Sequence, residues 1–398
     1  MTSWGVKRRG VCQTRSGKLA FSSSFASPQF FQLQNNDRWQ VKFITPPLFA
    51  VMSVNINVLG LGNAEPCLPI FGGGTRRCSR LLPHAMMGPM RLVYMGSPEF
   101  AVLPLRYLVE EGHNVLAVYT KMDKPAGRGH VLSISPVKRE ALALGLTVVQ
   151  PKNLKDDEVQ SELGLFRPEA IIVCAYGQIL PAAVLALPKY GCLNIHPSLL
   201  PRHRGAAPVT ATILAGDEWG GTSVMLMDEG LDTGPVLTRA LVRVRTDDTT
   251  GLLTARLAPV SARLLLDVLP RWVKGGLALQ AQDKAQATYF KMMAKEAGEI
   301  DWTRPAAEIE RRVRAFQPWP AAYTHFQGRL LKVLSSRVVL GEADMTPGKV
   351  AAIGKGFGVA TGAGVLEVLG VQLEGRQAVS GADFLRGQRD FADIVLPT

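Results

Sequence analysis

Residues 191–201 read GCLNIHPSLLP, and the rest of the chain is best interpreted outward from this stretch. Apolar residues alternate through its first half and predict a buried strand, which ends at His-Pro-Ser because proline cannot donate to a sheet ladder. Asn194 and His196 lie two positions apart, so on a strand they point to the same face. An amide donor beside an imidazole at the carboxyl end of a strand suits chemistry at a carbonyl. The alternative is an Asn and a His that only cap the strand.

From residue 90 onward, short apolar strands alternate with amphipathic helices. Strands are predicted at 91–95, 113–119, 146–149, 170–174 and 222–227, and helices over 136–145, 156–163 and 249–274. This alternation predicts an α/β fold with a Rossmann-like, doubly wound and mostly parallel sheet. Ser97 and Pro98 are placed to cap and begin a helix after the first strand. Gly96 stands alone rather than in a GxGxxG motif, so a dinucleotide site is not supported.

The pattern changes at about residue 278, where a polar linker begins. An amphipathic helix is predicted over 305–316. Short strands separated by Gly and Pro follow at 322–326, 329–334, 348–353, 357–360 and 365–372. These five strands predict a small β-barrel of the oligonucleotide-binding (OB) type, with a β-sandwich fragment as the alternative. Ser380 with Asp383 resembles a capping box for a last helix.

These shifts divide the chain into four parts. We expect a leader at 1–89, a catalytic domain at 90–277, a linker at 278–296 and a C-terminal OB-like domain at 297–398. A chain of 398 residues is long enough for two or three domains with their own cores.

The leader differs from everything after it. Residues 1–89 hold ten Lys or Arg and two acids, so they account for +8 of the chain's formal net charge of +12. No sustained helical or strand period is present, and we expect disorder. An Arg-rich, acid-poor leader also fits an organelle transit peptide. A third interpretation, which we favour, is a start codon upstream of the true one, with Met87 or Met90 as the real beginning.

Composition excludes several protein classes. The chain is 47% hydrophobic and 20% charged, as is usual for globular proteins, and no run of about 18 uncharged apolar residues predicts a membrane span. The five cysteines form no CxxC motif and no cluster with His. We therefore expect neither a metal site nor a disulfide framework, and a reducing compartment fits.

Two loops carry further candidate residues. Residues 121–136 form a longer connection than the usual βα loop, and this loop carries Lys124 and Arg128 beside glycines. It could lay a guanidinium on a phosphate backbone, or it could be a solvated loop. Asp232 lies in the loop that follows the strand at 222–227. Near His196 this carboxylate would orient the imidazole or shuttle its proton, while an Asx-turn or a helix cap is the structural alternative.

Several segments together resemble the folate-dependent formyltransferase family, and within it the branch that acts on initiator methionyl-tRNA. They are MGSPEFAV (95–102), KPAGRG (124–129), VCAYGQILP (173–181), GCLNIHPSLLPRHRGAAP (191–208), MDEGLDTGPVL (227–237) and AFQPWPAAY (315–323). The resemblance covers about residues 90–398 and leaves out the leader. The Asn-x-His and Gly-Leu-Asp-Thr-Gly elements are typical of the whole family, whereas the PAGRG loop and the C-terminal barrel indicate the tRNA branch.

The resemblance implies transfer of the formyl group of 10-formyltetrahydrofolate to the α-amino group of methionine on initiator tRNA, with no metal. It implies Asn194, His196 and Asp232 as catalytic residues. It also implies that residues 198–201 (Ser198, Leu199, Leu200 and Pro201) lie against the folate, with the Tyr176-Gly177 backbone as another wall. Arg128 and Lys124 would contact the tRNA.

Other interpretations stay open at this point. The formyl acceptor could be a small amine such as glycinamide ribonucleotide or an amino sugar nucleotide, water could replace the amine, or the chain could be a non-catalytic RNA-binding protein. The partners we expect are initiator Met-tRNA and the folate, with no membrane, and the chain is expected to be a monomer. We expect a cytoplasmic protein, or a mitochondrial or plastid one if the leader is a transit peptide.

Overall fold

A computed structural model describes residues 88–126, 131–339, 346–388 and 390–398, together with the backbone of five short strands nearer the start. These strands are β1 (Gly10–Thr14), β2 (Gly17–Phe21), β3 (Gln32–Leu33), β4 (Arg38–Phe43) and β5 (Met52–Asn57). Most of residues 1–89, for which disorder was predicted, lie outside the described residues, so that expectation stays a prediction; the five described strands were not predicted.

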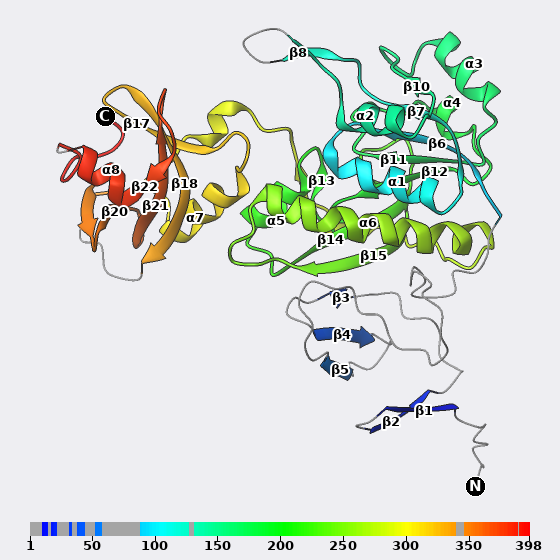
Figure 1. Ribbon diagram of the computed structural model, residues 1–398, viewed down its shortest axis with the longest axis horizontal. Helices are drawn as coiled ribbons and strands as arrows, with labels where there is room; N and C mark the ends of the chain where they lie inside the picture. Colours follow the sequence, from blue (N-terminus) through cyan, green and yellow to red (C-terminus); the bar gives the residue numbers. More distant parts are fainter. Residues whose placement is uncertain are drawn as a thin grey trace, which may run out of the picture.

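The first domain is built on a mostly parallel sheet (Figure 1). Its parallel strands are β6 (Arg91–Gly96), β7 (Asn114–Tyr119), β10 (Val148–Val149), β11 (Ala170–Cys174) and β12 (Cys192–His196). Their order is β10-β7-β6-β11-β12; β14 (Trp219–Leu226) then pairs antiparallel with β12, and β15 (Val236–Arg243) pairs antiparallel with β14. The pairing order continues beyond β15 into β3, β4 and β5. The predicted Rossmann-like, mostly parallel sheet is confirmed, while β15 was not predicted.

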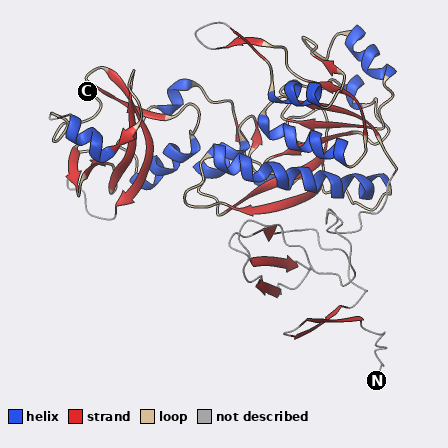
Figure 2. Cartoon of the chain, in the orientation of Figure 1, coloured by secondary structure: helices blue, strands red, loops and turns tan. Residues whose placement is uncertain are grey.

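Helices pack around this sheet (Figure 2). They are α1 (Val102–Glu110), α2 (Pro136–Ala143), α3 (Asp157–Leu165), α4 (Ala182–Leu185), α5 (Pro208–Leu214) and α6 (Thr250–Val273). Alternate residues of β6 enter two different cores: Leu92 and Tyr94 join the core with α1 and α6, and Val93 and Met95 join a second core with α3 and α4. Both faces of β6 are therefore buried, as the continuous apolar run predicted.

The helix after β6 begins differently from the prediction. A short 3-10 turn, η1 (Glu99–Ala101), precedes α1, and Pro98 occupies its N-cap position without a side-chain cap. The Ser97 hydroxyl instead accepts hydrogen bonds from Thr120 Oγ1 and the Lys121 backbone N–H, at 3.2 Å each. Ser97 therefore ties the ends of β6 and β7 together, and the predicted cap is wrong.

The second domain is an antiparallel sheet with a helix at each end of its sequence. Its strands are β17 (Ala322–Phe326), β18 (Arg329–Val339), β19 (Val350–Ile353), β20 (Gly356–Ala360), β21 (Val365–Leu373) and β22 (Val379–Ser380), and its helices are α7 (Ala306–Ala315) and α8 (Gly381–Gly387). The strand order is β17-β18-β21-β20-β19, with β22 on β21. At the start of α8 the Asp383 N–H donates to Ser380 Oγ at 3.1 Å, which confirms the predicted cap.

The two domains contact each other at α7 as well as through the chain between them (Figure 1). Ala315 and Phe316 are buried in the core of the first domain. The Thr250 hydroxyl donates to the Ala315 carbonyl at 2.6 Å. The connecting segment holds η2 (Lys284–Gln286), β16 (Tyr289–Phe290) and η3 (Lys295–Gly298), and β16 pairs in parallel with β13 (Arg204–Gly205) of the first domain. None of the helices in the described ranges is both long and apolar enough to cross a membrane.

Candidate active site

The site lies where β12 ends at the edge of the parallel sheet. Strands β6, β11 and β12 are adjacent and parallel, so their carboxyl ends, and the loops that follow them, meet at one edge. In doubly wound sheets this edge is where ligands bind. β12 places Asn194 and His196 on one face here, and both side chains are largely buried, at 8% and 5% exposure.

Asp232 joins these two residues from the loop between β14 and β15. Its Oδ1 accepts a hydrogen bond from Asn194 Nδ2 at 3.3 Å and lies 3.6 Å from His196 Nδ1. Its Oδ2 accepts from the Gly205 backbone N–H at 2.8 Å. The backbone of Asp232 has a φ of +53°, in the left-handed region that Asp tolerates better than most residues. The three predicted catalytic residues are thus brought together around one carboxylate.

The second nitrogen of His196 fixes the tautomer of the ring. Nε2 lies 3.0 Å from the backbone carbonyl oxygen of His203. A carbonyl only accepts, so this contact requires a proton on Nε2, which leaves Nδ1 to gain or lose a proton on the side of Asp232. The His196 carbonyl accepts from Thr222 Oγ1 at 3.1 Å, which holds the end of β12 against β14.

The loop after His196 is held by neighbouring strands. The Ser198 hydroxyl donates to the Arg202 carbonyl at 2.7 Å, and the Ser198 carbonyl accepts from Ser223 Oγ at 2.7 Å. Leu200 is 1% exposed in a small core with residues of β14 and β15, and the peptide bond to Pro201 is cis. The Leu200 carbonyl accepts from Arg239 Nε at 2.7 Å.

These contacts turn most of the predicted folate-binding side chains inward. Leu199 packs against Gly221, where an added Cβ would lie 2.4 Å from Leu199 Cδ2. The ring of Tyr176 is 1% exposed in the second core, and burial raises the pKa of its hydroxyl. Gly177 is exposed and has a φ of +75°. The side chains of Ser198, Leu199, Leu200 and Tyr176 therefore pack into the protein, and Gly177 is the exposed residue of the set.

The predicted tRNA-binding residues are not placed by the structure. Arg128 lies outside the described residues, and Lys124 is described only by its backbone in β8 (Lys124–Ala126). β8 pairs antiparallel with β9 (Val131–Ser133), so the long loop carries a two-stranded hairpin that extends from the domain (Figure 1). Its base is held by Asp123, which pairs with Lys138 and accepts from Gln150 Nε2 at 2.9 Å.

Some residues that shape the site were missed from the sequence. The His203 carbonyl and the Gly205 N–H act through the backbone, so their residue types carry no signal. Gln282, 50 positions after Asp232, donates through Nε2 to the Asp232 carbonyl at 2.9 Å and to the Gly234 carbonyl at 2.7 Å. In the sequence Gln282 is one of several polar residues of the predicted linker, and this position gave no sign of a contact with Asp232.

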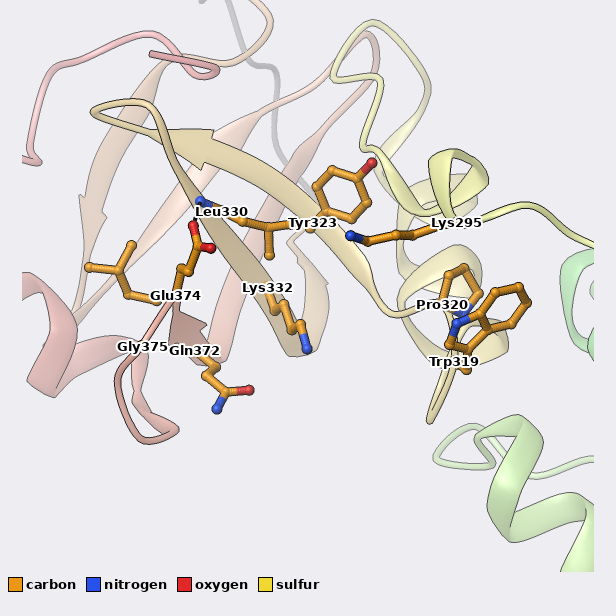
Figure 3. A pocket seen from close by; sticks show the side chains of 10 residues that line it. Lys295, Trp319, Pro320, Tyr323, Leu330, Lys332, Gln372, Glu374 and Gly375 are labelled. Carbon is orange, nitrogen blue, oxygen red and sulfur yellow. Dashed lines mark hydrogen bonds between the residues drawn. The ribbon is translucent and has the colours of Figure 1, made fainter. Parts of the chain in front are cut away.

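The C-terminal domain has a cavity of its own. Figure 3 shows Lys295, Lys332, Tyr323 and Trp319 around it, and the Trp319 ring is 53% exposed. Two amines beside an exposed indole fit contact with a polyanion that carries stacking groups. In the described ranges, no group of three or more His, Cys, Asp or Glu side chains is placed to hold a metal ion.

Comparison with known proteins identifies the family of this chain. Residues 90–269 match the formyl transferase family, and residues 292–389 match the formyl transferase C-terminal domain. The chain is 50% identical over 311 residues to the methionyl-tRNA formyltransferase of Dehalococcoides mccartyi. The match covers 78% of this chain and 99% of that protein. The chain belongs to the methionyl-tRNA formyltransferase family. The formyltransferase of Marinobacter nauticus that carries the same name is 44% identical, over 77% of this chain and 98% of that one.

Solved structures show the same fold at lower identity. An N-formyltransferase from Helicobacter canadensis, solved with folinic acid and dTDP-3-aminofucose, superposes with a TM-score of 0.53 at 16% identity, over 73% of this formyltransferase and all of that chain. HypX from Aquifex aeolicus, solved with tetrahydrofolic acid, has a TM-score of 0.50 at 17% identity, over 75% of this chain and 47% of that one.

Proposed function

We propose that this formyltransferase moves the formyl group of 10-formyltetrahydrofolate to the α-amino group of methionine on initiator tRNA. The observation that carries the proposal is the shared carboxylate of Asp232, with the Asn194 amide and the His196 imidazole on it at the carboxyl edge of the sheet. The family membership supplies the folate and the methionyl acceptor.

The reaction needs a neutral amine, a donor that stabilises the oxyanion and a proton for the leaving nitrogen. The neutral amine attacks the formyl carbon and forms a new C–N bond, so the carbonyl oxygen becomes an oxyanion. The bond from that carbon to the folate nitrogen then breaks. The amine loses a proton and the leaving nitrogen gains one, so the step consumes and releases nothing else.

The three polar side chains match these demands. The Asn194 amide carries two N–H groups, and one of them is used on Asp232, so the other is available to the formyl oxygen. His196 Nδ1 lies on the same side, 3.6 Å from Asp232 Oδ1, and is proposed to take or give the proton there. The low exposure of both residues strengthens a hydrogen bond to a developing charge, and such a donor is worth about 3 kcal/mol, or roughly a hundredfold in rate.

The folate is proposed to lie along the backbone at residues 198–201 on one side and at Tyr176-Gly177 on the other. The inward packing of Ser198, Leu199 and Leu200 supports backbone contact rather than side-chain contact. Gly177 is exposed and would supply backbone polar contacts, while apolar walls suit the flat heterocycle of the folate.

The tRNA is proposed to contact two cationic regions. One is the β8–β9 hairpin with Lys124 and Arg128, and the other is the C-terminal cavity with Lys295 and Lys332 (Figure 3). The antiparallel sheet of the second domain supports an OB-like assignment. We also propose the predicted boundaries: a catalytic domain at 90–277, a linker at 278–296 and a C-terminal domain at 297–398. We further propose that the enzyme is a cytoplasmic monomer.

One experiment tests the acceptor. Purified protein is incubated with 10-formyltetrahydrofolate and initiator Met-tRNA, elongator Met-tRNA, an amino sugar nucleotide or no acceptor, and formyl-amine product and free tetrahydrofolate are measured. Rapid formylation of initiator Met-tRNA is expected. Faster formylation of the sugar nucleotide, or tetrahydrofolate release at the same rate without acceptor, would instead indicate a small-amine transferase or a hydrolase.

A further inference from the structure

The segment that connects the two domains lies against the loop after β12, whose backbone contacts His196 and Asp232. β16 pairs in parallel with β13, with Arg204 opposite Tyr289 and Gly205 opposite Phe290. The Arg204 N–H donates to the Thr288 carbonyl at 2.8 Å, and the Ala206 N–H donates to the Phe290 carbonyl at 3.1 Å. The connecting segment therefore forms part of the wall of the site.

The fit between the two strands is close at Gly205. This glycine has a φ of +104°, and an added Cβ would lie 2.4 Å from the Phe290 carbonyl oxygen. Its N–H is the donor to Asp232 Oδ2. The position of Phe290 therefore bears directly on a hydrogen bond to the catalytic carboxylate.

Gln282 is bonded on every side by parts of the site. Its Nε2 donates to the carbonyls of Asp232 and Gly234. Its Oε1 accepts from Arg204 at 3.1 Å from Nε and 2.8 Å from Nη2. One amide thus joins the loop that carries Asp232 to the loop that carries Gly205, and all of its usual hydrogen-bonding capacity is used.

Thr288 holds the loop that carries Gly205 at a second point, His203. Its Oγ1 accepts from the His203 N–H at 2.8 Å, and His203 Nε2 lies 2.6 Å from Asp217 Oδ2. The carbonyl of the same His203 faces His196 Nε2. A shift of Thr288 would therefore move the group that orients the catalytic imidazole.

We propose that Gln282 and Thr288, both in the segment between the domains, are positioning residues that hold Asp232 and His196 in their reacting geometry. The inference rests on the proposed function for its kinetic test only. Neither side chain needs to touch substrate. A displacement of about 1 Å at a reacting group can cost about a hundredfold in rate, so losing such a contact reduces turnover more than binding.

The kinetic test uses near-isosteric variants of the full chain. Gln282→Glu keeps the contacts with Arg204 but replaces the Nε2 group, which donates to the Asp232 and Gly234 carbonyls, with an oxygen that can only accept. Thr288→Val removes the hydroxyl that accepts from the His203 N–H. For both we expect kcat to fall about 10- to 100-fold, while KM for Met-tRNA and Kd for the folate stay within about twofold. Thr288→Ser keeps the hydroxyl and should restore kcat. Gln286→Glu is the matched control, since Gln286 is exposed and donates to Asp283 in the same segment.

A second readout does not depend on which acceptor is used. In protein labelled with 15N-histidine, the Nε2–H of His196 is identified by its loss in His196→Asn, and its exchange with water is measured. Thr288→Val should speed this exchange at least about tenfold, and Thr288→Ser should not. Unchanged exchange together with unchanged kcat in Gln282→Glu and Thr288→Val would overturn the inference. Failure of the wild-type protein to formylate Met-tRNA would overturn the proposed function alone, because the exchange measurement still decides the inference.

Discussion

His196 Nδ1 lies 3.6 Å from Asp232 Oδ1, although the two residues are 36 positions apart in the sequence. With Nε2 committed to the His203 carbonyl, Nδ1 is the ring nitrogen left to exchange a proton in the proposed reaction. The same carboxylate oxygen accepts from Asn194, so one acid orders both polar groups of β12. The arrangement explains why an amide, an imidazole and a carboxylate are found together at this edge.

Asp232→Asn should inactivate the enzyme with little effect on folding. An Asn side chain has one oxygen in place of two, so it loses the contact with Gly205 or the contact with Asn194 and His196. We expect kcat for Met-tRNA formylation to fall about 100-fold or more, with the folate Kd within about threefold. Activity near the wild-type level would show that the carboxylate does not act on His196.

Arg128→Ala should raise KM for Met-tRNA at least about tenfold and leave folate binding unchanged, because the proposed role of its guanidinium is to contact phosphate. Lys124→Ala should have a smaller effect of the same kind. The measurement is KM at several salt concentrations, and each lost phosphate contact should lower the slope of log affinity against log salt by about one. Equal losses in tRNA and folate binding would remove the hairpin from tRNA recognition.

The sequence predicted the core of the site well because its signals are local. The apolar run before Pro197 set the strand, and the spacing of two put Asn194 and His196 on one face. Asp232 was a candidate from its loop, but an Asx-turn or a helix cap fitted that loop equally well, and the family resemblance was needed to choose between them. The contacts of Gln282 and Thr288 with the site could not be predicted from the sequence. They depend on the pairing of two strands of two residues each, 85 positions apart, and such short strands leave no periodic pattern.

The fold was predicted where apolar patterns are continuous and was missed where they are broken. Strand β15 contains Arg239 and Arg243, and these charges hide its pattern, although Arg239 is turned inward to the Leu200 carbonyl. Ser97 has the sequence context of a helix cap, but Thr120 and Lys121 compete for its hydroxyl across the sheet edge. Tertiary contacts outweighed the local preference there.

Phe391→Ala should destabilise the C-terminal domain. Phe391 is fully buried and packs edge-on against Phe326, Phe357 and Phe384, with ring centroids 4.8 to 5.0 Å apart. Removing the ring should lower the free energy of unfolding by about 3–5 kcal/mol, and Phe391→Leu should cost less. Urea unfolding followed by circular dichroism measures both. A loss below about 1 kcal/mol for the alanine variant would contradict this packing.

The two buried thiols of the catalytic domain should resist alkylation in the folded protein. Burial raises the pKa of Cys174 and of Cys192 to about 12. At pH 8 only about one thiol in 10,000 is then ionised, and access is blocked as well. Iodoacetamide labelling with peptide mapping should find both residues unmodified until denaturant is added. Labelling at equal rates with and without denaturant would contradict their burial.

The same raised pKa values predict loss of stability at alkaline pH. In the unfolded chain a thiol has a pKa near 8.5, so above about pH 9 the unfolded state has released protons that the folded state still holds. Below about pH 8.5 both states keep the thiol protons, so these thiols do not lower the free energy of unfolding. As the pH rises from there toward about 12, each thiol lowers the free energy of unfolding by about 1.4 kcal/mol per pH unit. Urea midpoints measured from pH 8 to 11 should fall, and the fall should be smaller in Cys174→Ala and Cys192→Ala.

The most direct test of the site is single-turnover formyl transfer by Asn194→Asp and His196→Asn variants, with enzyme in excess over Met-tRNA and saturating 10-formyltetrahydrofolate. Asn194→Asp keeps the size of the side chain and removes the amide donor, whereas His196→Asn keeps a polar but smaller side chain and removes the titratable imidazole. We predict that each lowers the transfer rate about 100-fold or more, while tRNA and folate binding persist. Transfer at the wild-type rate in either variant would contradict a reaction carried out on the carboxylate, amide and imidazole at the end of β12.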